Sequence, residues 1–304
     1  MPKTPLFNRQ QPGGFDDFLS FDRHPGNIWF VGSAVTGSSN SVGTGYGYGP
    51  DAPFATLVYA LTQCTASQGD VIYLLPGHIE TVGATALTIG VAGVAIRGIG
   101  EGFIQPRISL TASVVGGAIL VTAASLQFEN ILFQADVEDV AQAITISASD
   151  CTFRNCRFLG DNANDHNALI WISDTAALIS SITVEDCLFC DTDASNTNGI
   201  TFTGTGRQHV IRRNRFIGHW ITWAIGGAGA IVDADVSDNY IYNVHAAADN
   251  GINLANATKG VMMNNRCSTG QASVAQMTAP FLAKCENYGG IIGDSNGLLE
   301  PATA

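Results

Sequence analysis

Charged side chains are scarce in this 304-residue chain, and lysine is nearly missing. Charged residues make up 13% of the sequence, and its three lysines are Lys3, Lys259 and Lys284. The sequence has 14 basic and 26 acidic side chains, which gives a net charge of −12. Binding to nucleic acid or to an anionic membrane surface requires clustered cations. The sequence therefore predicts no nucleic-acid partner. It also predicts no membrane insertion, because no run approaches the ~20 apolar residues of a membrane span.

Cysteine occurs in an odd number, seven, without a clear ligand pattern. Cys187 and Cys190 form one C-x-x-C, a spacing that can serve metal or redox chemistry. No second pair and no histidine stands at ligand spacing, which favours buried thiols over a metal site. We expect no metal and no cofactor, and such thiols suit synthesis in a reducing cytoplasm. The start, Met-Pro-Lys-Thr-Pro, lacks the apolar stretch of a signal peptide.

A six-residue phrase recurs through the middle of the chain and organises it. Its copies are FENILF (128–133), FRNCRF (153–158), VEDCLF (184–189), IRRNRF (211–216), VSDNYI (236–241) and MMNNRC (262–267). They recur every 25 to 31 residues. A period of this size is typical of stacked repeats, each of which buries its apolar side against its neighbours.

The phrase is apolar at positions 1, 4 and 6, which one straight strand cannot place on a single face. A sharp bend between positions 1 and 4 removes this conflict. The fourth residues, among them Asn214, Asn239 and Asn265, would then stack at one corner, together with Cys156 and Cys187.

Further short strands, which alternate inward and outward residues, follow the phrases at 144–146, 170–172, 200–202 and 252–254. Two or three short strands per coil predict an all-β solenoid, a parallel β-helix whose coils lie ~4.8 Å apart. Position 2 supports this register, since successive coils carry Glu129, Arg154, Glu185 and Arg212. Opposite charges in such a column attract, although each exposed pair contributes only ~0.2–1 kcal/mol. The alternative is an antiparallel sandwich of short strands.

The repeat divides the chain into four parts. Residues 1–27 form an arm, and 28–68 contain a strand, a loop and a helix expected at 51–64. An amphipathic helix at this point can cover the open end of a solenoid. The coils fill residues 69–267, and a C-terminal cap and tail follow at 268–304.

The arm is apolar and aromatic, with Phe15, Phe18, Leu19 and Phe21 between two prolines. It is too short for a domain and too apolar for a free linker. Two interpretations remain: the arm attaches the protein to a larger partner, or it folds along its own coils.

The order of strand, Gly/Ser loop, PFAT (53–56) and GDVIYLLPG (69–77) resembles the start of right-handed parallel β-helix proteins of the pectin-lyase-like class, especially those of tailed bacteriophages. The likeness covers residues 27–100 by motif and 100–267 by repeat style. The arm, which ends in DRHPG (22–26), resembles head decoration or head-fibre proteins. The resemblance implies a right-handed single-stranded β-helix with an N-terminal capping helix and an extended arm. It also implies a place on the capsid surface of a virion that is made in the host cytoplasm.

Glycoside hydrolysis needs two carboxylates ~5 to 9.5 Å apart, and two loops offer candidates. The candidate carboxylates are Asp161, Asp165, Asp191 and Asp193. His166 stands beside the first loop, and Trp171, expected to point outward, would provide a platform for a sugar ring.

Residues 195–199, SNTNG, resemble the Asn-Thr-Asp-Gly motif of polygalacturonase-like hydrolases. Asn198 stands in place of the catalytic aspartate, and an amide can neither protonate a leaving group nor activate water. Asn250-Gly251 repeats the dipeptide on another coil, which favours a turn in which Asn and Gly adopt positive φ. We therefore expect no catalytic residue.

Two functions stay open, because one architecture can serve both. The resemblance and the missing catalytic pair favour a structural virion protein, which the resemblance implies is a capsid decoration (head-fibre or cement) protein that binds the phage major capsid protein. The alternative is a tailspike-like glycoside hydrolase or lyase that acts on a host surface polysaccharide. Depolymerising tailspikes usually carry longer β-helices and a separate C-terminal trimerisation module, and this chain is shorter.

Position 5 of the phrase predicts a contact between copies of the chain. It faces outward and reads Leu132, Arg157, Leu188, Arg215, Tyr240 and Arg266 on successive coils. Large apolar groups interleaved with arginine, with lysine depleted, are typical of an interface core. Closed symmetry is expected, with dimers commonest in general. Related phage β-helices favour a homotrimer with the coils side by side. In the other interpretation, the arm of the same chain covers these residues.

Overall fold

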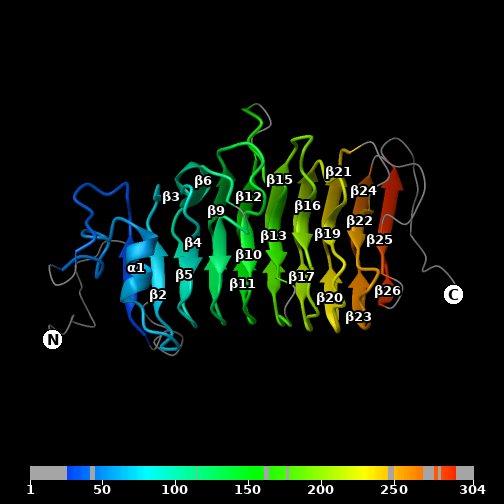
Figure 1. The fold of residues 1–304 in the computed structure, drawn as a ribbon, viewed down its shortest axis with the longest axis horizontal. Helices are drawn as coiled ribbons and strands as arrows, with labels where there is room; N and C mark the ends of the chain where they lie inside the picture. Colours follow the sequence, from blue (N-terminus) through cyan, green and yellow to red (C-terminus); the bar gives the residue numbers. More distant parts are fainter. Residues whose placement is uncertain are drawn as a thin grey trace.

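The computed structural model is a long stack of coils built from three parallel sheets (Figure 1). It describes residues 26–41, 45–114, 116–160, 164–175, 178–245, 250–269, 277–279 and 282–291. Each strand pairs in parallel with its counterpart one coil away, as β8, β11 and β14 do. This arrangement confirms the parallel β-helix and excludes an antiparallel sandwich.

The three sheets are named here A, B and C. Sheet A contains β1 (Ile28–Val31), β2 (Val71–Leu74), β5 (Ala95–Gly98), β8 (Gln127–Glu129), β11 (Thr152–Arg154), β14 (Thr183–Glu185), β17 (Val210–Arg212), β20 (Ala234–Ser237), β23 (Gly260–Met263) and β26 (Ala283–Cys285). Sheet B contains β3 (Ile79–Val82), β6 (Arg107–Leu110), β9 (Leu132–Ala135), β12 (Arg157–Leu159), β15 (Leu188–Asp191), β18 (Arg215–Gly218), β21 (Tyr240–Asn243), β24 (Arg266–Thr269) and β27 (Tyr288–Ile291). Sheet C contains β4 (Leu87–Ile89), β7 (Ile119–Val121), β10 (Ile144–Ile146), β13 (Ile170–Asp174), β16 (Asn198–Thr201), β19 (Trp223–Gly226), β22 (Asn250–Asn253) and β25 (Met277–Thr278).

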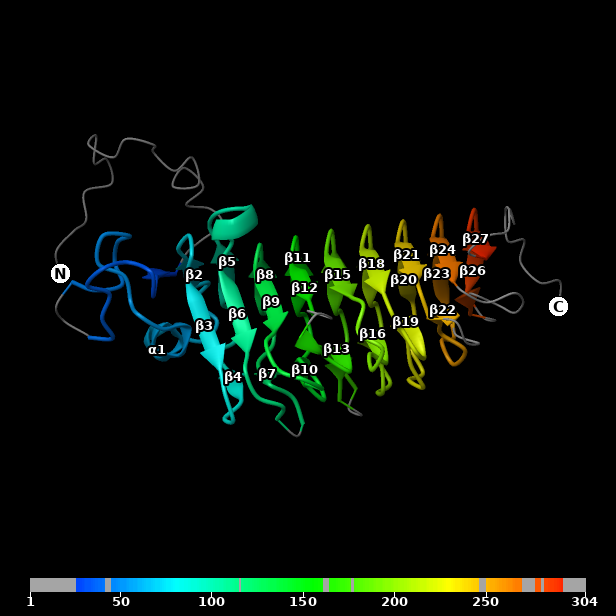
Figure 2. The ribbon, with the colours of Figure 1, turned by 90° about the horizontal axis from the view of Figure 1, so that it is seen from above.

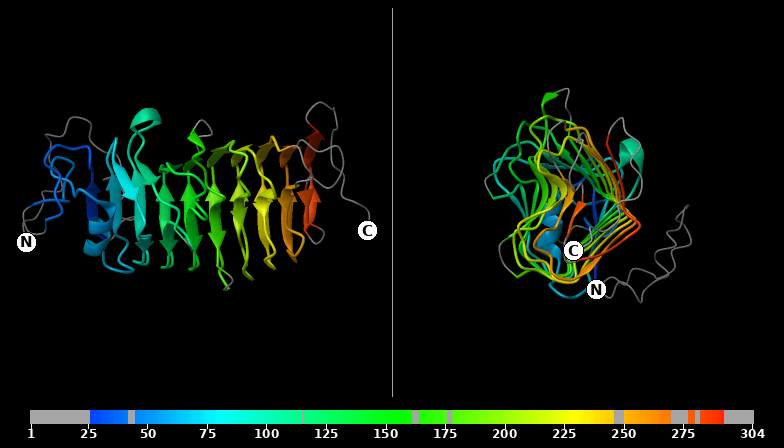
Figure 3. Two further views of the ribbon diagram at one scale, coloured as in Figure 1. Left: turned by 45° about the horizontal axis from the view of Figure 1, so that its top comes forward. Right: turned by 90° about the vertical axis from the view of Figure 1, so that its right-hand side faces the viewer.

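Each coil passes from sheet A through sheet B to sheet C before the next coil begins (Figures 2 and 3). The corner between sheets A and B falls inside the recurring phrase. Its third residue adopts a left-handed backbone conformation, with φ of 51° to 57°, in all six copies of the phrase: Asn130, Asn155, Asp186, Arg213, Asp238 and Asn264. The predicted bend between positions 1 and 4 is therefore confirmed.

An asparagine ladder fills the inside of this corner. The Nδ2 of Asn214 donates to the Oδ1 of Asn239 at 3.1 Å, and Asn239 donates in the same way to Asn265 at 3.0 Å. Each side chain also donates to a main-chain carbonyl, Asn239 to that of Ile211 at 2.8 Å. These bonds satisfy amide groups that are otherwise out of contact with water. The ladder continues through Asn287, which the sequence analysis did not include.

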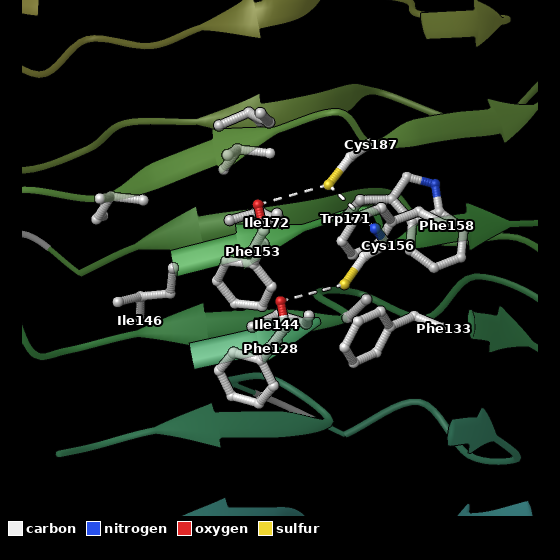
Figure 4. Close-up of a cluster of buried hydrophobic side chains, with 14 of the residues drawn as sticks. Phe128, Phe133, Ile144, Ile146, Phe153, Cys156, Phe158, Trp171, Ile172 and Cys187 are labelled. Atoms are coloured by element: carbon white, nitrogen blue, oxygen red, sulfur yellow. Dashed lines mark hydrogen bonds between the residues drawn. The ribbon is translucent and has the colours of Figure 1, made fainter. Parts of the chain in front are cut away.

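Phenylalanine side chains stack along the core in two columns, one behind sheet A and one behind sheet B (Figure 4). Phe128 and Phe153 stack at 4.7 Å, and Phe158 stacks on Phe189 at 4.3 Å. Neighbouring rings of this kind contribute ~0.5–1.5 kcal/mol beyond the area that they bury. Positions 1 and 6 of the phrase therefore form the core, as predicted.

The helix α1 (Leu57–Gln63) lies at the N-terminal end of the stack (Figure 1). It begins later than the predicted residue 51, because Thr56 caps it by accepting from the Tyr59 main-chain nitrogen at 3.2 Å. Its buried Leu57 and Leu61 join the core of the coils. Among the described residues, no helix has both the length and the apolar character to span a membrane.

The coils continue beyond residue 267, where the sequence analysis ended them. Residues 284–289 are a seventh copy of the phrase, in which Asn287 joins the ladder and Tyr288 pairs with Arg266. The copy is hard to recognise because Lys284 and Gly289 replace its apolar first and last residues. The predicted boundary at 267 is therefore too early.

Candidate functional site

The loop after β15 was one of two candidates for catalytic carboxylates. Asp191, which the sequence analysis placed in this loop, is the last residue of β15 and is 1% exposed. One of its oxygens, Oδ2, accepts from the indole Nε1 of Trp171 at 3.1 Å and from the Ala168 main-chain nitrogen at 3.2 Å. Burial raises the pKa of Asp191 to about 6, against the effect of these hydrogen bonds. A carboxyl with such a pKa suits general acid catalysis, but here no substrate atom can reach it.

Of the other candidate carboxylates, the structure describes Asp193 and Asp165. Asp193 is buried, and its Oδ1 accepts from the Ser195 main-chain nitrogen at 2.7 Å, which fixes the turn. Asp165 is exposed and has a φ of 51°. Asp161 lies outside the described residues.

Trp171 does not provide a sugar platform, and the prediction that it points outward is wrong. Its ring is buried and packs edge-on against Phe158 at 5.9 Å (Figure 4). The neighbouring Ile172 is buried as well, so β13 does not alternate strictly at this point. Two consecutive side chains enter the core there, and the pairing register between β13 and β16 skips Trp171.

The Asn198-Gly199 dipeptide is not a turn with positive φ, as the sequence analysis expected. Asn198 begins β16, and neither residue is among those with positive φ. Glycine is required here because a Cβ at residue 199 would lie 2.5 Å from the Ala224 carbonyl and 2.8 Å from the Phe216 ring. The motif is therefore a strand start with an inward glycine.

The C-x-x-C does not form a site either. Cys187 is buried and its Sγ contacts the Phe153 carbonyl at 3.6 Å (Figure 4), while Cys190 sits on the outer side of β15. Burial raises the pKa of Cys187 well above its ordinary value. Among the residues that the structure describes, no three side chains are grouped to hold a metal ion.

The outer face of sheet B holds all six residues of the predicted subunit contact. They lie in register on consecutive strands, half-buried or exposed, in the order Leu132, Arg157, Leu188, Arg215, Tyr240 and Arg266. The column extends further than the phrase, because Ile79 and Arg107 precede it and Tyr288 follows it. Apolar and arginine rungs thus alternate along the whole of a nine-stranded sheet. Ile79 and Arg107 escaped the sequence analysis because their coils lack the phrase.

A second outward column runs beside the first, two residues further along each strand. Its central rungs are the half-buried side chains of Leu159, Cys190, Ile217 and Tyr242. Neither column contains an acidic residue or a lysine among the described residues. The two columns together are called the sheet-B face below. The sequence signal for the second column is weak, because it lies outside the six-residue phrase.

Arginines on sheets A and B differ in their partners. On sheet A, Arg154 and Arg212 bind Glu185, the latter at 2.8 Å, and Arg213 at the following corner binds it at 3.0 Å. Glu185 is 1% exposed, so the charge column predicted at the surface is partly buried. Burial raises the pKa of Glu185, but the hydrogen bonds from Arg154 and Arg212 outweigh it and lower the pKa overall.

The arginines of the sheet-B face have no such counter-charge. Arg157, Arg215 and Arg266 make no ion pair with any residue in the part of the chain that the structure describes. The predicted attachment residues Phe15, Phe18, Leu19 and Phe21 lie outside the described residues.

No protein-family model and no curated protein matches the chain. Among solved structures it is similar to the deglycosylated pectin methylesterase from Aspergillus niger, at 14% identity and a TM-score of 0.52, over 88% of this chain and 92% of that one. It is also similar to the pectate lyase Pel9A, at 14% identity and a TM-score of 0.53, over 91% and 78% of the two chains. The fold is the right-handed parallel β-helix of the pectin-lyase-like class. At this identity the likeness establishes the fold alone.

Asp191 makes the stability of this β-helix dependent on pH. Because its folded pKa of about 6 lies above the ordinary 3.8, the folded state holds a proton that the unfolded state has lost. Its contribution to the unfolding free energy is therefore full below pH 4 and falls by about 3 kcal/mol as pH rises to 7. Asp191→Asn keeps an acceptor for Trp171 and removes the titration.

We expect the stability of Asp191→Asn relative to wild type to rise by about 2–3 kcal/mol between pH 4 and pH 7. Urea unfolding at several pH values measures this difference. The contributions of the other carboxyl groups cancel because both proteins share them. A difference that does not change with pH would show that folding does not raise the pKa of Asp191.

Proposed function

We propose that the protein is a structural component of a phage virion. In this role it is a head-fibre or cement protein that binds the major capsid protein on the outer surface of the head. It is made in the host cytoplasm. Two likenesses support the proposal: the opening motifs resemble those of tailed-phage β-helix proteins, and the arm resembles that of head decoration or head-fibre proteins.

One observation carries the non-enzymatic part of the proposal. At the end of β15 and just after it, Asp191 and Asp193 accept hydrogen bonds from main-chain and indole N–H groups of their own chain. A glycosidase needs one carboxylate to protonate the leaving oxygen and a second to attack or to activate water. Oxygens already committed to buried hydrogen bonds are poorly placed for either task.

The alternative is a tailspike-like enzyme that cleaves a host surface glycan. Its support is that the two similar solved structures are a pectin methylesterase and a pectate lyase. Under this alternative the glycan is a substrate. Under the structural proposal it is at most a ligand.

Incubation with capsular polysaccharide from the host separates the two functions. We expect no new reducing ends and no unsaturated sugar products from wild type at micromolar concentration over hours. The variants Asp165→Asn, Asp191→Asn and Asp193→Asn should assemble on particles as wild type does. Cleavage by wild type that any of these variants abolishes would make the protein an enzyme.

A further inference from the structure

A small apolar cluster lies on the outer side of sheet A, apart from the core of the coils. Its members come from β1, β2 and β5 and from the residue that follows β2: Phe30, Val71, Tyr73, Leu75 and Ala95. The residues that alternate with them on β2, Ile72 and Leu74, belong to the core. Successive residues of a strand point to opposite faces, so the cluster faces outward. It is called the sheet-A patch below.

The sheet-A patch is buried although it faces outward. Phe30 and Tyr73 are 6% and 7% exposed, and their rings stack with their centroids 5.7 Å apart. Among the described residues, the other apolar side chains packed against the patch are Ile28, Val35 and Ile99, each of them half-buried. An apolar occupant from outside the described residues accounts for the low exposure of the two rings.

The patch is confined to the N-terminal end of the stack, where β2 and β5 lie (Figure 2). On the following strands of sheet A, the same outward columns become polar. Tyr73 is followed in register by Arg97 and Glu129, and Ala95 is followed by Gln127. Polar side chains suit a solvated face, so an apolar occupant is required only beside the first strands.

We infer that residues 15–21 of the arm pack on the sheet-A patch in the free chain. This segment, which lies outside the described residues, carries Phe15, Phe18, Leu19 and Phe21. The inference does not depend on the virion role. Attachment to a particle through the same side chains requires them to leave the patch first.

The arm joins the coils at the edge of the patch. The main-chain nitrogen of Asn27 donates to Oδ1 of Asp70 at 2.5 Å, and Ile28 lies opposite Val71. An extended chain covers ~3.3–3.6 Å per residue, so Phe18 can lie up to ~30 Å from Ile28. Three strands ~4.8 Å apart are only ~10 Å across. The aromatic segment can therefore reach every part of the patch.

The tether favours the arm over an occupant in solution. A segment on a short flexible linker has an effective concentration in the millimolar range. A second copy of the chain, or a soluble partner, competes at micromolar concentration. The arm of the same chain is therefore the occupant.

Photo-crosslinking from the arm of the full chain tests this contact. p-Benzoylphenylalanine in place of Phe18 keeps an apolar aromatic side chain and reacts with the C–H groups that it contacts. Mass spectrometry of the product with the mass of one chain should map the crosslinks to residues 28–35, 71–75 and 95–99. The same group in place of Phe103, which is fully exposed, is the matched control and should give no crosslink within the chain.

Two sets of variants show whether the patch itself holds the arm. Phe30→Ser with Tyr73→Ser should lower the crosslinking yield about 10-fold or more, because each ring contributes apolar contact. Tyr240→Ser, on the sheet-B face, should leave the yield unchanged, and circular dichroism checks that all variants are folded.

Crosslinks from position 18 to the sheet-B face, to a second copy or to no residue of the chain overturn the inference. These outcomes are read in the otherwise unaltered chain, so they do not require the patch variant to fold. A folded patch variant that keeps the full yield overturns the inference as well.

Discussion

Removal of residues 1–24 should leave a soluble, folded β-helix that no longer joins phage particles. The described core begins at Trp29, and each described strand pairs with its counterparts on adjacent coils, so we expect the coils to fold without the arm. The arm contributes four large apolar side chains, Phe15, Phe18, Leu19 and Phe21. Buried in a partner, such side chains supply ~1.5–3 kcal/mol each, enough to account for most of a stable attachment.

Particles that lack the protein, incubated with full-length or truncated chain and then washed, give the occupancy by quantitative mass spectrometry. We expect occupancy to fall from full to background for the truncated chain. A chain with Phe15, Phe18 and Phe21 changed to serine keeps the length of the arm and should also fail to bind. Full occupancy by the truncated chain would show that another surface, not the arm, is the anchor.

The asparagine ladder should be the most sensitive polar element of the fold. Asn239→Ala removes the Oδ1 that accepts from both the main-chain nitrogen and the Nδ2 of Asn214, each at 3.1 Å. It also leaves the Ile211 carbonyl without its donor. Each buried unsatisfied group costs ~1–3 kcal/mol, so the unfolding free energy should fall by roughly 3–5 kcal/mol.

Asn256→Ala is the control for this substitution. Asn256 is exposed, and its Nδ2 donates to the Ala228 carbonyl at 2.9 Å. Water replaces that bond when the side chain is removed, so the loss should stay within about 1 kcal/mol. Urea unfolding of the two variants checks the difference, and equal losses would mean that the ladder adds no more than an ordinary surface bond.

The sequence was sufficient to predict the coils, their register and the corner. Those features depend on local rules: the spacing of apolar residues, residues at position 3 that accept a left-handed backbone, and amides that stack once per coil. Asn214, Asn239 and Asn265 therefore appear where the pattern predicted them. Glu129, Arg154 and Glu185 also stand on adjacent strands as expected.

The inner and outer orientation of single side chains could not be predicted where a strand departs from strict alternation. Trp171 enters the core because two consecutive residues of β13 point inward. Asp191 is buried beside Trp171, because its carboxyl accepts a hydrogen bond from the indole N–H. A sequence pattern with period two cannot show such a departure, so one residue was taken for a sugar platform and the other for a possible catalyst.

The location of the protein in purified virions tests the structural role most directly. Cryo-electron microscopy of particles with and without the protein should show its density on the outside of the head, at sites related by the symmetry of the capsid. The account predicts elongated density there and no difference at the tail. Density confined to the tail tip, or no density on the particle, would contradict it.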